Sequence, residues 1–485
     1  MQPKKWNAME VGCCVEQRPR CVAASLSMLI VATLLFLAFF PGGGGVYRWW
    51  SCQDGRAAQG EFLAHDAAHA PTTLSHIMFG IGASTLTWEQ RRGYAELWWR
   101  PDAMRGHVWL DEQPLGPWPA ATCPPYRVSA DASRFGNFTS ASRMARIVVE
   151  SFLAVSSDTG AGGEVRWFVM GDDDTVFFPD NLVAVLRKYD HEEMYYVGAP
   201  SESVEQNVRH SYGMAFGGGG FAVSYPAAAE LAKAMDGCLE RYSNFYGSDE
   251  RVKACLSELG IPLTREPGFH QVDIHGDAYG MLAAHPVAPL VSLHHLDQIE
   301  PIGPEGHTRL DAIQPLLSAS RFDSARLLQQ AFCYQHGPGY TWSVLIAWGY
   351  TVQLYSWAVA PCELEVPLLT FKTSRTWSDG PFVFNTRPSS MGPCSWPARF
   401  FLSRVQNGTG GGGTVTEYSV KMEKECDQGN TASTVHTVKV FAPKMAQDEW
   451  KRAPRRHCCK TITTSLDTVL EVQIRHCSRG EIATP

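Results

Sequence analysis

The most informative residues of the chain are RWFVMGDDDTVF, at positions 166–177. Residues 166–170 form a short apolar run that predicts a strand buried on both faces. Asp172, Asp173 and Asp174 follow at its carboxyl end, the edge of an α/β sheet where ligands commonly bind. Three adjacent carboxylates repel one another unless a cation or solvent relieves them. We therefore expect a hard divalent cation, Mn²⁺ or Mg²⁺, at this triplet, and the alternative is a solvated acidic turn.

Strand-like and helix-like segments alternate around this stretch, which predicts an α/β domain over residues 74–320. Helices are expected where apolar residues recur at helical spacing, and strands where short apolar runs end in glycine or polar residues. The expected strands are 74–81, 107–110, 166–170, 194–197 and 220–223, and the expected helices are 91–99, 139–155, 179–189, 226–242 and 248–260.

The pattern changes after about residue 335. Four later stretches alternate apolar and polar residues and are rich in Val, Thr and Tyr, as is typical of half-buried strands. These stretches are residues 351–357, 414–422, 433–441 and 463–474. Residues 335–485 are therefore predicted to form a mostly antiparallel β module.

The beginning of the chain predicts a membrane anchor. Residues 22–40 contain no charge and are long enough, as a helix, to cross a bilayer. A cleaved signal peptide is the alternative, but its apolar run is usually shorter. Lys and Arg residues precede the span, so we expect a cytoplasmic tail over 1–21, a stem over 41–73 and a luminal body.

Overall charge argues against a nucleic-acid partner. The 485 residues carry a formal net charge of -7, and no Lys/Arg stripe offers a phosphate-binding surface. The membrane, through residues 22–40, is instead an expected partner.

The segment from Trp167 to Phe177 resembles the signature of Fringe and the related β-1,3-glycosyltransferases. It is still more similar to that of a plant family of Fringe-related proteins of unknown function. Further matching segments follow in order, and together they cover roughly residues 74–400. These segments are 212–221, 246–251, 268–271, 285–286, 292–297 and 382–387.

The resemblance implies a glycosyltransferase-A fold, an inverting mechanism and Mn²⁺ (or Mg²⁺) on the diphosphate of a UDP-sugar. It implies that Asp174 is the direct metal ligand and that Asp172 and Asp173 lie against the nucleotide and its ribose. His294 or His295 supplies the second protein ligand, and the sequence does not choose between them.

The resemblance also implies where the sugar and the catalytic base lie. Gly218 and Gly219 belong to a glycine run that forms the floor near the sugar and acceptor, where glycine permits close approach to the backbone. Asp249 is the expected general base, with Glu250 as the second candidate. The competing interpretation is that both acids only complement the dipole of a helix first turn.

Cysteine usage agrees with an oxidising compartment. Eleven of the fourteen cysteines lie beyond residue 40 without a zinc-type spacing, which favours disulfides with at least one thiol left over. Cys238 and Cys255 flank the Asp249 segment, and a disulfide between them would hold it rigid. An N-glycosylation sequon at Asn137 suits the same compartment.

These features indicate a Golgi type II membrane enzyme that moves a sugar from a UDP-sugar to a hydroxyl of a glycan or glycoprotein. One alternative is a glycan-binding or scaffold protein that kept the fold without catalysis. Another is a haloacid-dehalogenase-like phosphatase, in which Asp172 would be the nucleophile. That class needs a later Lys and acidic pair in matching strands, and the sequence offers no convincing set.

Overall fold

The computed structural model describes residues 70–157, 164–304, 307–388, 397–408, 412–420, 434–462 and 468–485. Residues Pro71–Pro485 group as one compact unit. Within the described ranges, no helix is both long and apolar enough to span a bilayer. The predicted tail, the predicted span at 22–40 and nearly all of the predicted stem lie outside those ranges. The domain boundaries at 74–320 and 335–485 stay predictions.

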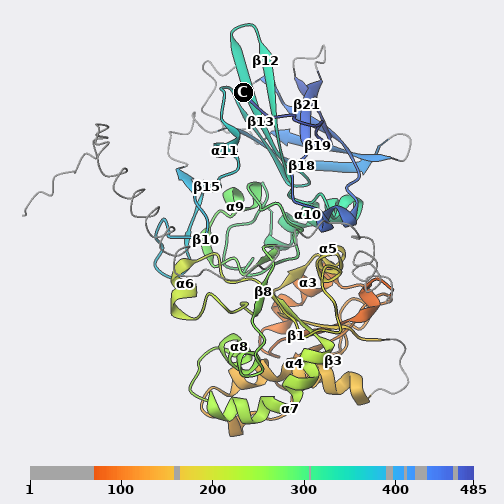
Figure 1. The fold of residues 1–485 in the computed structure, drawn as a ribbon, viewed down its shortest axis with the longest axis vertical. Helices are drawn as coiled ribbons and strands as arrows, with labels where there is room; N and C mark the ends of the chain where they lie inside the picture. Colours follow the sequence, from red (N-terminus) through yellow and green to blue (C-terminus); the bar gives the residue numbers. More distant parts are fainter. Residues whose placement is uncertain are drawn as a thin grey trace, which may run out of the picture. The chain divides into compact units, whose positions relative to one another are not determined.

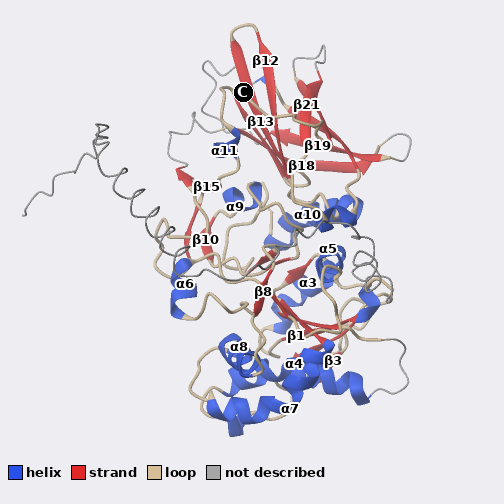
Figure 2. Cartoon of the chain, viewed as in Figure 1, coloured by secondary structure: helices blue, strands red, loops and turns tan. Residues whose placement is uncertain are grey.

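A seven-stranded sheet lies at the centre of the first half of this unit (Figures 1 and 2). Its strand order is β3-β2-β1-β4-β7-β6-β8, and every neighbouring pair is parallel except those that β7 makes with β4 and β6. The strands are β1 Ile77–Gly82, β2 Arg105–Leu110, β3 Tyr126–Val128, β4 Trp167–Asp172, β6 Tyr196–Gly198, β7 Phe221–Ser224 and β8 Leu263–Arg265.

Both faces of this sheet are buried, which explains the continuous apolar runs of its strands. In β1, Ile77, Phe79 and Ile81 belong to one hydrophobic core, whereas Met78 belongs to the other. Helices α4, α7 and α8 contact one another and contribute to the second core, and Figure 1 shows them together on one side of β1. The buried strand predicted at 166–170 is confirmed as β4, with all side chains before Asp172 buried.

Among the described residues, α3, α4, α5, α7 and α8 lie where helices were predicted, whereas α6, α9, α10 and α11 were not predicted. Pro179 occupies the first turn of α5, where its missing N–H costs nothing. The α-helices are α3 Trp88–Trp98, α4 Thr139–Ser157, α5 Pro179–Leu186, α6 Val204–Arg209, α7 Tyr225–Arg241, α8 Ser248–Glu258, α9 Tyr279–Ala283, α10 Arg309–Asp323 and α11 Pro361–Leu364. Single 3₁₀ turns are η1 Leu74–His76, η2 Ser133–Phe135 and η5 Gln447–Lys451.

The second half of the unit contains an eight-stranded sheet, labelled by β12, β13, β18, β19 and β21 in Figure 1. All its neighbouring strands are antiparallel except β20 and β22, so the predicted mostly antiparallel module is confirmed. In spatial order the strands are β12 Gln330–Gly337, β13 Tyr340–Ala347, β14 Thr351–Tyr355, β18 Ala398–Asn407, β19 Gly413–Val420, β20 Thr437–Pro443, β22 Val469–Arg475 and β21 Cys458–Ile462.

Three small sheets join distant segments. The one nearest the acidic triplet has the order β5-β11-β9, and two further pairs are β10–β16 and β15–β17. Their bounds are β5 Val176–Phe177, β9 Phe269–His270, β10 Ile274–Gly276, β11 Ser292–Leu293, β15 Leu368–Leu369, β16 Phe371–Thr373 and β17 Arg387–Pro388.

Three disulfides cross-link the described residues. Cys238 in α7 pairs with Cys255 in α8, as the sequence suggested. The other two, Cys333–Cys459 and Cys458–Cys477, lie in and beside the eight-stranded sheet. Cys123 and Cys362 form no disulfide.

Gly280 of α9 packs closely against the backbone of Leu368 in β15, and a substitution at Gly280 tests this contact. A Cβ at this position would overlap the carbonyl oxygen of Leu368, a backbone atom that cannot rotate away. We expect Gly280→Ala to lower the free energy of unfolding by about 1–3 kcal/mol, measured by chemical denaturation.

The matched control is Gly237→Ala, in the interior of α7. There the nearest atom to a new Cβ is the flexible Arg241 guanidinium, at 3.3 Å. Alanine should stabilise this helix by up to about 1 kcal/mol. Equal effects of the two substitutions would contradict the packing of α9 described above.

Candidate active site

The acidic triplet begins at the last residue of β4 and turns sharply. The backbone N–H of Thr175 donates to the Asp172 carbonyl at 3.1 Å, and the Thr175 hydroxyl accepts from the Asp172 N–H at 2.8 Å. This turn leads directly into β5, so the three carboxylates lie between two strands that belong to different sheets.

Strand β5 brings a distant histidine to the triplet. Val176 pairs with Leu293, and Phe177 pairs with Ser292, in antiparallel register. His294 follows β11 directly, and its Nε2 lies 3.0 Å from Asp174 Oδ1 and 3.7 Å from Asp172 Oδ2. Two residue pairs of sheet therefore join positions that are far apart in the sequence.

Asp172, Asp174 and His294 can together hold a metal ion, because one ligand atom from each lies within 4.8 Å of the others. Asp174 and His294 are buried. Neither carboxylate oxygen of Asp174 accepts a hydrogen bond within the described part of the chain, and the Nδ1 of His294 also has no hydrogen-bond partner there. A buried carboxylate left without hydrogen-bond donors is costly, and a divalent cation would satisfy it.

Charges within the cluster shift its pKa values strongly. Burial and the neighbouring carboxylates raise the pKa of Asp172 to about 7, with His294 opposing them. Burial also opposes ionisation of Asp174, but His294 and Arg91 outweigh it and lower its pKa to about 2. The same carboxylates overcome the burial of His294 and raise its pKa to about 9. Without metal, His294 is therefore the cation that pairs with Asp174 at neutral pH.

Asp173 faces away from this cluster, towards α3. Its Oδ2 accepts from the Thr87 hydroxyl at 2.7 Å, and its Oδ1 accepts from Arg91 at 3.1 Å. Arg91 also donates to Asp297 at 2.5 Å and lies 3.5 Å from Asp174. Sequence analysis missed Thr87, Arg91 and Asp297 as members of the site. The helical pattern of α3 gives no sign that Arg91 points at the triplet.

The adjacent histidine has a different environment. His295 has a positive φ of 52°, and its Nδ1 lies 3.3 Å from Asp273 Oδ1. The Ser201 hydroxyl donates to the other oxygen of Asp273 at 2.5 Å. Of the two histidines that the sequence left open, the structure thus brings His294 to the triplet and turns His295 towards Asp273.

The predicted glycine floor lies beside this histidine. A Cβ on Gly218 would overlap the imidazole ring of His294, so only glycine fits there without displacing it. The Gly218 carbonyl accepts from the Thr175 hydroxyl at 2.7 Å, and the Gly219 N–H donates to Gln271 at 2.6 Å. These bonds fix the loop against the turn that carries the acidic triplet.

Asp249 contacts the same loop from another direction. A Cβ on Gly217 would lie 2.6 Å from Asp249 Oδ1, so the carboxylate packs directly on the loop backbone. Asp249 accepts from the Ser248 hydroxyl at 3.0 Å, and burial raises its pKa. The glycine loop therefore has a candidate cation site against Gly218 and a carboxylate against Gly217, one residue apart.

Glu250 is engaged elsewhere. Its Oε2 accepts from the Gly247 N–H at 3.1 Å, which caps the first turn of α8. Its Oε1 lies 2.8 Å from His210 Nδ1. With both oxygens occupied, Glu250 is less free than Asp249 to receive a proton from a ligand.

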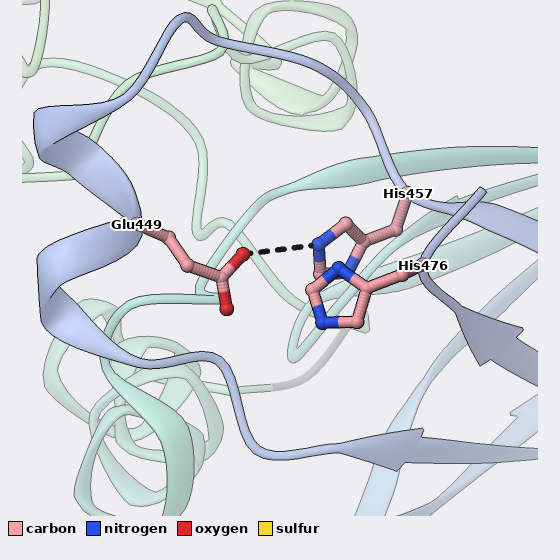
Figure 3. Close-up of side chains that lie close together, drawn as sticks. All are labelled: Glu449, His457 and His476. Atoms are coloured by element: carbon pink, nitrogen blue, oxygen red, sulfur yellow. Dashed lines mark hydrogen bonds and ion pairs between the residues drawn. The ribbon is translucent and has the colours of Figure 1, made fainter. Parts of the chain in front are cut away.

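A second group of possible metal ligands lies beside the eight-stranded sheet, where Figure 3 shows Glu449, His457 and His476 facing one another. Here Arg326 Nη1 lies 2.9 Å from His457 Nδ1. A guanidinium only donates, so Nδ1 accepts, and the proton of His457 is on Nε2, pointing at Glu449 Oε2 at 3.2 Å. Its metal-facing nitrogen is thus protonated and already paired, which makes this group a structural network rather than a cation site.

Comparisons with known proteins agree with the sequence resemblance. The family model described as "Protein of unknown function, DUF604" matches residues 206–459, which is just over half of the chain. The model described as "Fringe-like" matches residues 131–279, a range that includes the acidic triplet, the glycine loop and Asp249.

Two curated relatives carry the name beta-1,3-glucosyltransferase. The human protein is 34% identical over 131 residues, covering 26% of this chain and 23% of its own length. The mouse protein is 30% identical over 165 residues, covering 32% and 29% respectively. The chain thus spans about a quarter of the length of the curated relatives that it matches.

The contact between Gly218 and His294 gives a direct test of the cation site. Gly218→Ala should displace the imidazole and weaken Mn²⁺ binding by about tenfold or more, measured by calorimetry. Gly213→Ala is the control, because only the Ser211 hydroxyl oxygen, at 3.6 Å, lies near its Cβ. Unchanged Mn²⁺ affinity in a folded Gly218→Ala protein would exclude His294 as a ligand.

Binding of Mn²⁺ should also depend on pH. A proton must leave His294 before its nitrogen can bind a cation, and the raised pKa of about 9 keeps that proton on at neutral pH. The apparent affinity should therefore rise about tenfold per unit between pH 7 and 9, one proton being released, and more steeply below pH 7, where Asp172 with its pKa of about 7 must also lose a proton. A flat profile between pH 6 and 8 would contradict the assignment.

Proposed function

Since the chain belongs to the family of proteins of unknown function called DUF604, its activity must be argued from its site, and we propose that it is a metal-dependent inverting glycosyltransferase. It would move a sugar from a UDP-sugar to a hydroxyl of a glycan or glycoprotein acceptor. The observation that carries this proposal is the glycine loop, with Asp174 and His294 on its metal side and Asp249 packed on the next residue.

The sheet and its ligand edge support a glycosyltransferase-A type of domain. The triplet follows the central strand β4 at its carboxyl end, where α/β sheets bind nucleotides. Asp172, Asp174 and His294 are the residues that would hold Mn²⁺ or Mg²⁺. The bound ion would offset the negative charge that grows on the departing UDP.

The chain's own residues would perform the remaining steps. Asp249 would accept the proton of the acceptor hydroxyl as its oxygen attacks the anomeric carbon from the face opposite to UDP. Its raised pKa makes it a stronger base than an ordinary Asp. The glycine backbone beside it leaves room for the sugar, and Arg91 would fix Asp173 and Asp297 at the nucleotide side.

The names of the two relatives suggest the first donor to test. Both are called beta-1,3-glucosyltransferases, so UDP-glucose comes before other UDP-sugars.

We also propose a luminal, type II Golgi location. It rests on the apolar segment at 22–40, on three disulfides typical of an oxidising compartment, and on the exposed sequon residue Asn137. Protease treatment of intact microsomes should spare the domain around Asp172, and digestion without detergent would contradict this topology.

Two substitutions should separate the cation site from the base. Asp174→Ala removes a metal ligand, so both Mn²⁺-dependent UDP binding and transfer should fall. Asp249→Asn keeps the shape of the side chain but cannot take a proton, so UDP binding should survive while transfer falls by about 10²–10⁴-fold. Calorimetry with UDP and Mn²⁺, beside transfer or hydrolysis of UDP-glucose, measures both effects.

The outcomes distinguish enzyme from glycan-binding protein. Normal transfer by Asp249→Asn would move the role of base to another residue. Mn²⁺-dependent UDP binding without hydrolysis or transfer from any UDP-sugar would favour the non-catalytic alternative. Unchanged UDP binding by Asp174→Ala would defeat the proposal itself.

A further inference from the structure

A cavity of about 820 Å³ lies at the β8 edge of the seven-stranded sheet. Its walls come from the segments after β6 and β8, from the end of α9, and from residues 365–367 and 383–385 next to β15 and β17. Figure 1 shows α9 and β15 on the same side of β8, and α9 contacts β15. Its volume lies within the range of small-ligand sites, which often form where two structural regions meet.

One wall is a buried chain of polar side chains. His285 Nδ1 lies 2.8 Å from the Pro286 carbonyl oxygen, which only accepts, so Nδ1 carries the proton and Nε2 accepts. His270 Nε2, 3.0 Å away, must therefore donate to it. The other nitrogen of His270 lies 3.0 Å from Glu202 Oε1, within hydrogen-bond distance. Burial and His270 lower the pKa of His285 to about 3, in keeping with a neutral ring.

The other acids that line the cavity are also paired. Arg456 donates to Glu365 at 2.9 Å, and Lys188 and the Tyr189 hydroxyl contact Glu266. Arg265 is left as the lining cation with no acidic partner among the described residues, and it donates to the Tyr212 carbonyl at 2.8 Å. One unpaired cation is too little for a diphosphate, so the cavity suits a neutral or singly acidic ligand.

Several lining groups keep free hydrogen-bonding capacity beside apolar surfaces. The Tyr212 hydroxyl and the Asn385 amide make no side-chain hydrogen bond to a described residue, and both side chains are exposed. Phe269 and Phe384 line the same cavity, and Phe384 is stacked on Phe382 at 5.7 Å. Aromatic faces beside scattered hydroxyl, amide and guanidinium groups match the apolar C–H faces and hydroxyl edges of sugar rings.

The cavity backs onto the candidate active site. His270 lines it, and the peptide between His270 and Gln271 packs against Gly219, whose Cβ would lie 3.1 Å from the Gln271 nitrogen. Ala199 also lines the cavity, and its carbonyl accepts from Phe216, the residue before the glycine loop. A single layer of backbone thus separates the cavity from the loop between His294 and Asp249.

We propose that this cavity binds saccharide units of the acceptor that lie beyond the reacting sugar. The proposal rests on the glycosyltransferase function proposed above and adds a site for the acceptor chain. Arg265, Tyr212 and Asn385 donate or accept hydrogen bonds with sugar hydroxyls, and Phe384 packs against a ring face. The Glu202–His270–His285 chain forms one wall of the cavity and is held in place by its own hydrogen bonds.

Binding of free oligosaccharides to the full-length chain in detergent tests the site. The probes are β-linked gluco-, galacto-, manno- and xylotetraose, with affinities from calorimetry and contacts from saturation-transfer NMR. Val383→Trp adds bulk at an exposed lining position and should weaken binding at least tenfold. Arg265→Met and Tyr212→Phe each remove one hydrogen-bonding group and should weaken saccharide binding about three- to tenfold.

Controls separate this site from the donor site. Arg127→Gln, on the exposed β3 edge at the opposite side of the same sheet, should leave saccharide affinity unchanged. All these variants should keep Mn²⁺-dependent UDP affinity within about twofold, because none contacts the triplet.

The remaining outcomes each count against a stated claim. Equal saccharide affinity of the wild-type chain and Val383→Trp overturns the cavity as the binding site. No binding of any of the four saccharides by a chain that binds UDP and Mn²⁺ normally also overturns it. If the wild-type chain does not bind UDP, the proposed function itself is wrong. If an acceptor peptide binds instead of the saccharides, and Val383→Trp blocks its binding, the cavity takes the protein part of a glycoprotein and not its sugars.

Discussion

The site depends on one very short piece of sheet, the pairing of β5 with β11. Only two residue pairs join these strands, yet they set the distance between Asp174 and His294. Both strands are held by neighbouring elements, since β5 follows the turn after β4 and β11 also pairs with β9. Because β9 leads into Gln271, the same small sheet also fixes the glycine loop. A shift of register here would separate the metal ligands and move the loop together.

The two sheets are not independent bodies. One hydrophobic core includes Phe79 of the first sheet, Leu316 of α10 and Val344 of the second sheet. Helix α10 contacts both α3 and β18, so it lies between them. A core shared in this way transmits packing defects from the β module to the face of the sheet that carries the triplet. The described part of the chain is better regarded as one folded unit with two architectures.

Local sequence patterns predicted elements but not the contacts between distant ones. The acidic triplet was recognisable because Trp167–Met170 has the unbroken apolar character of a buried strand. The choice between His294 and His295 needed the backbone, since the positive φ of His295 turns it towards Asp273. Arg91 was not predictable, because its role arises only when α3 packs beside the triplet.

The same limit applies to the second half. Helix α10 was missed because Pro315 interrupts its pattern, and the β12–β13 hairpin was missed although its inner strand is fully apolar from Val344 to Ala347. The disulfide between Cys238 and Cys255 could be suggested because both flank one segment. The same cross-link makes the position of α8 depend on redox conditions. Both cysteines are fully buried, so the bond must close before α7 and α8 finish packing, and afterwards no soluble reductant reaches it. Under reducing conditions Asp249 would lie on a helix that is not tethered to α7, so the position of this carboxylate depends on the oxidation state of two distant cysteines.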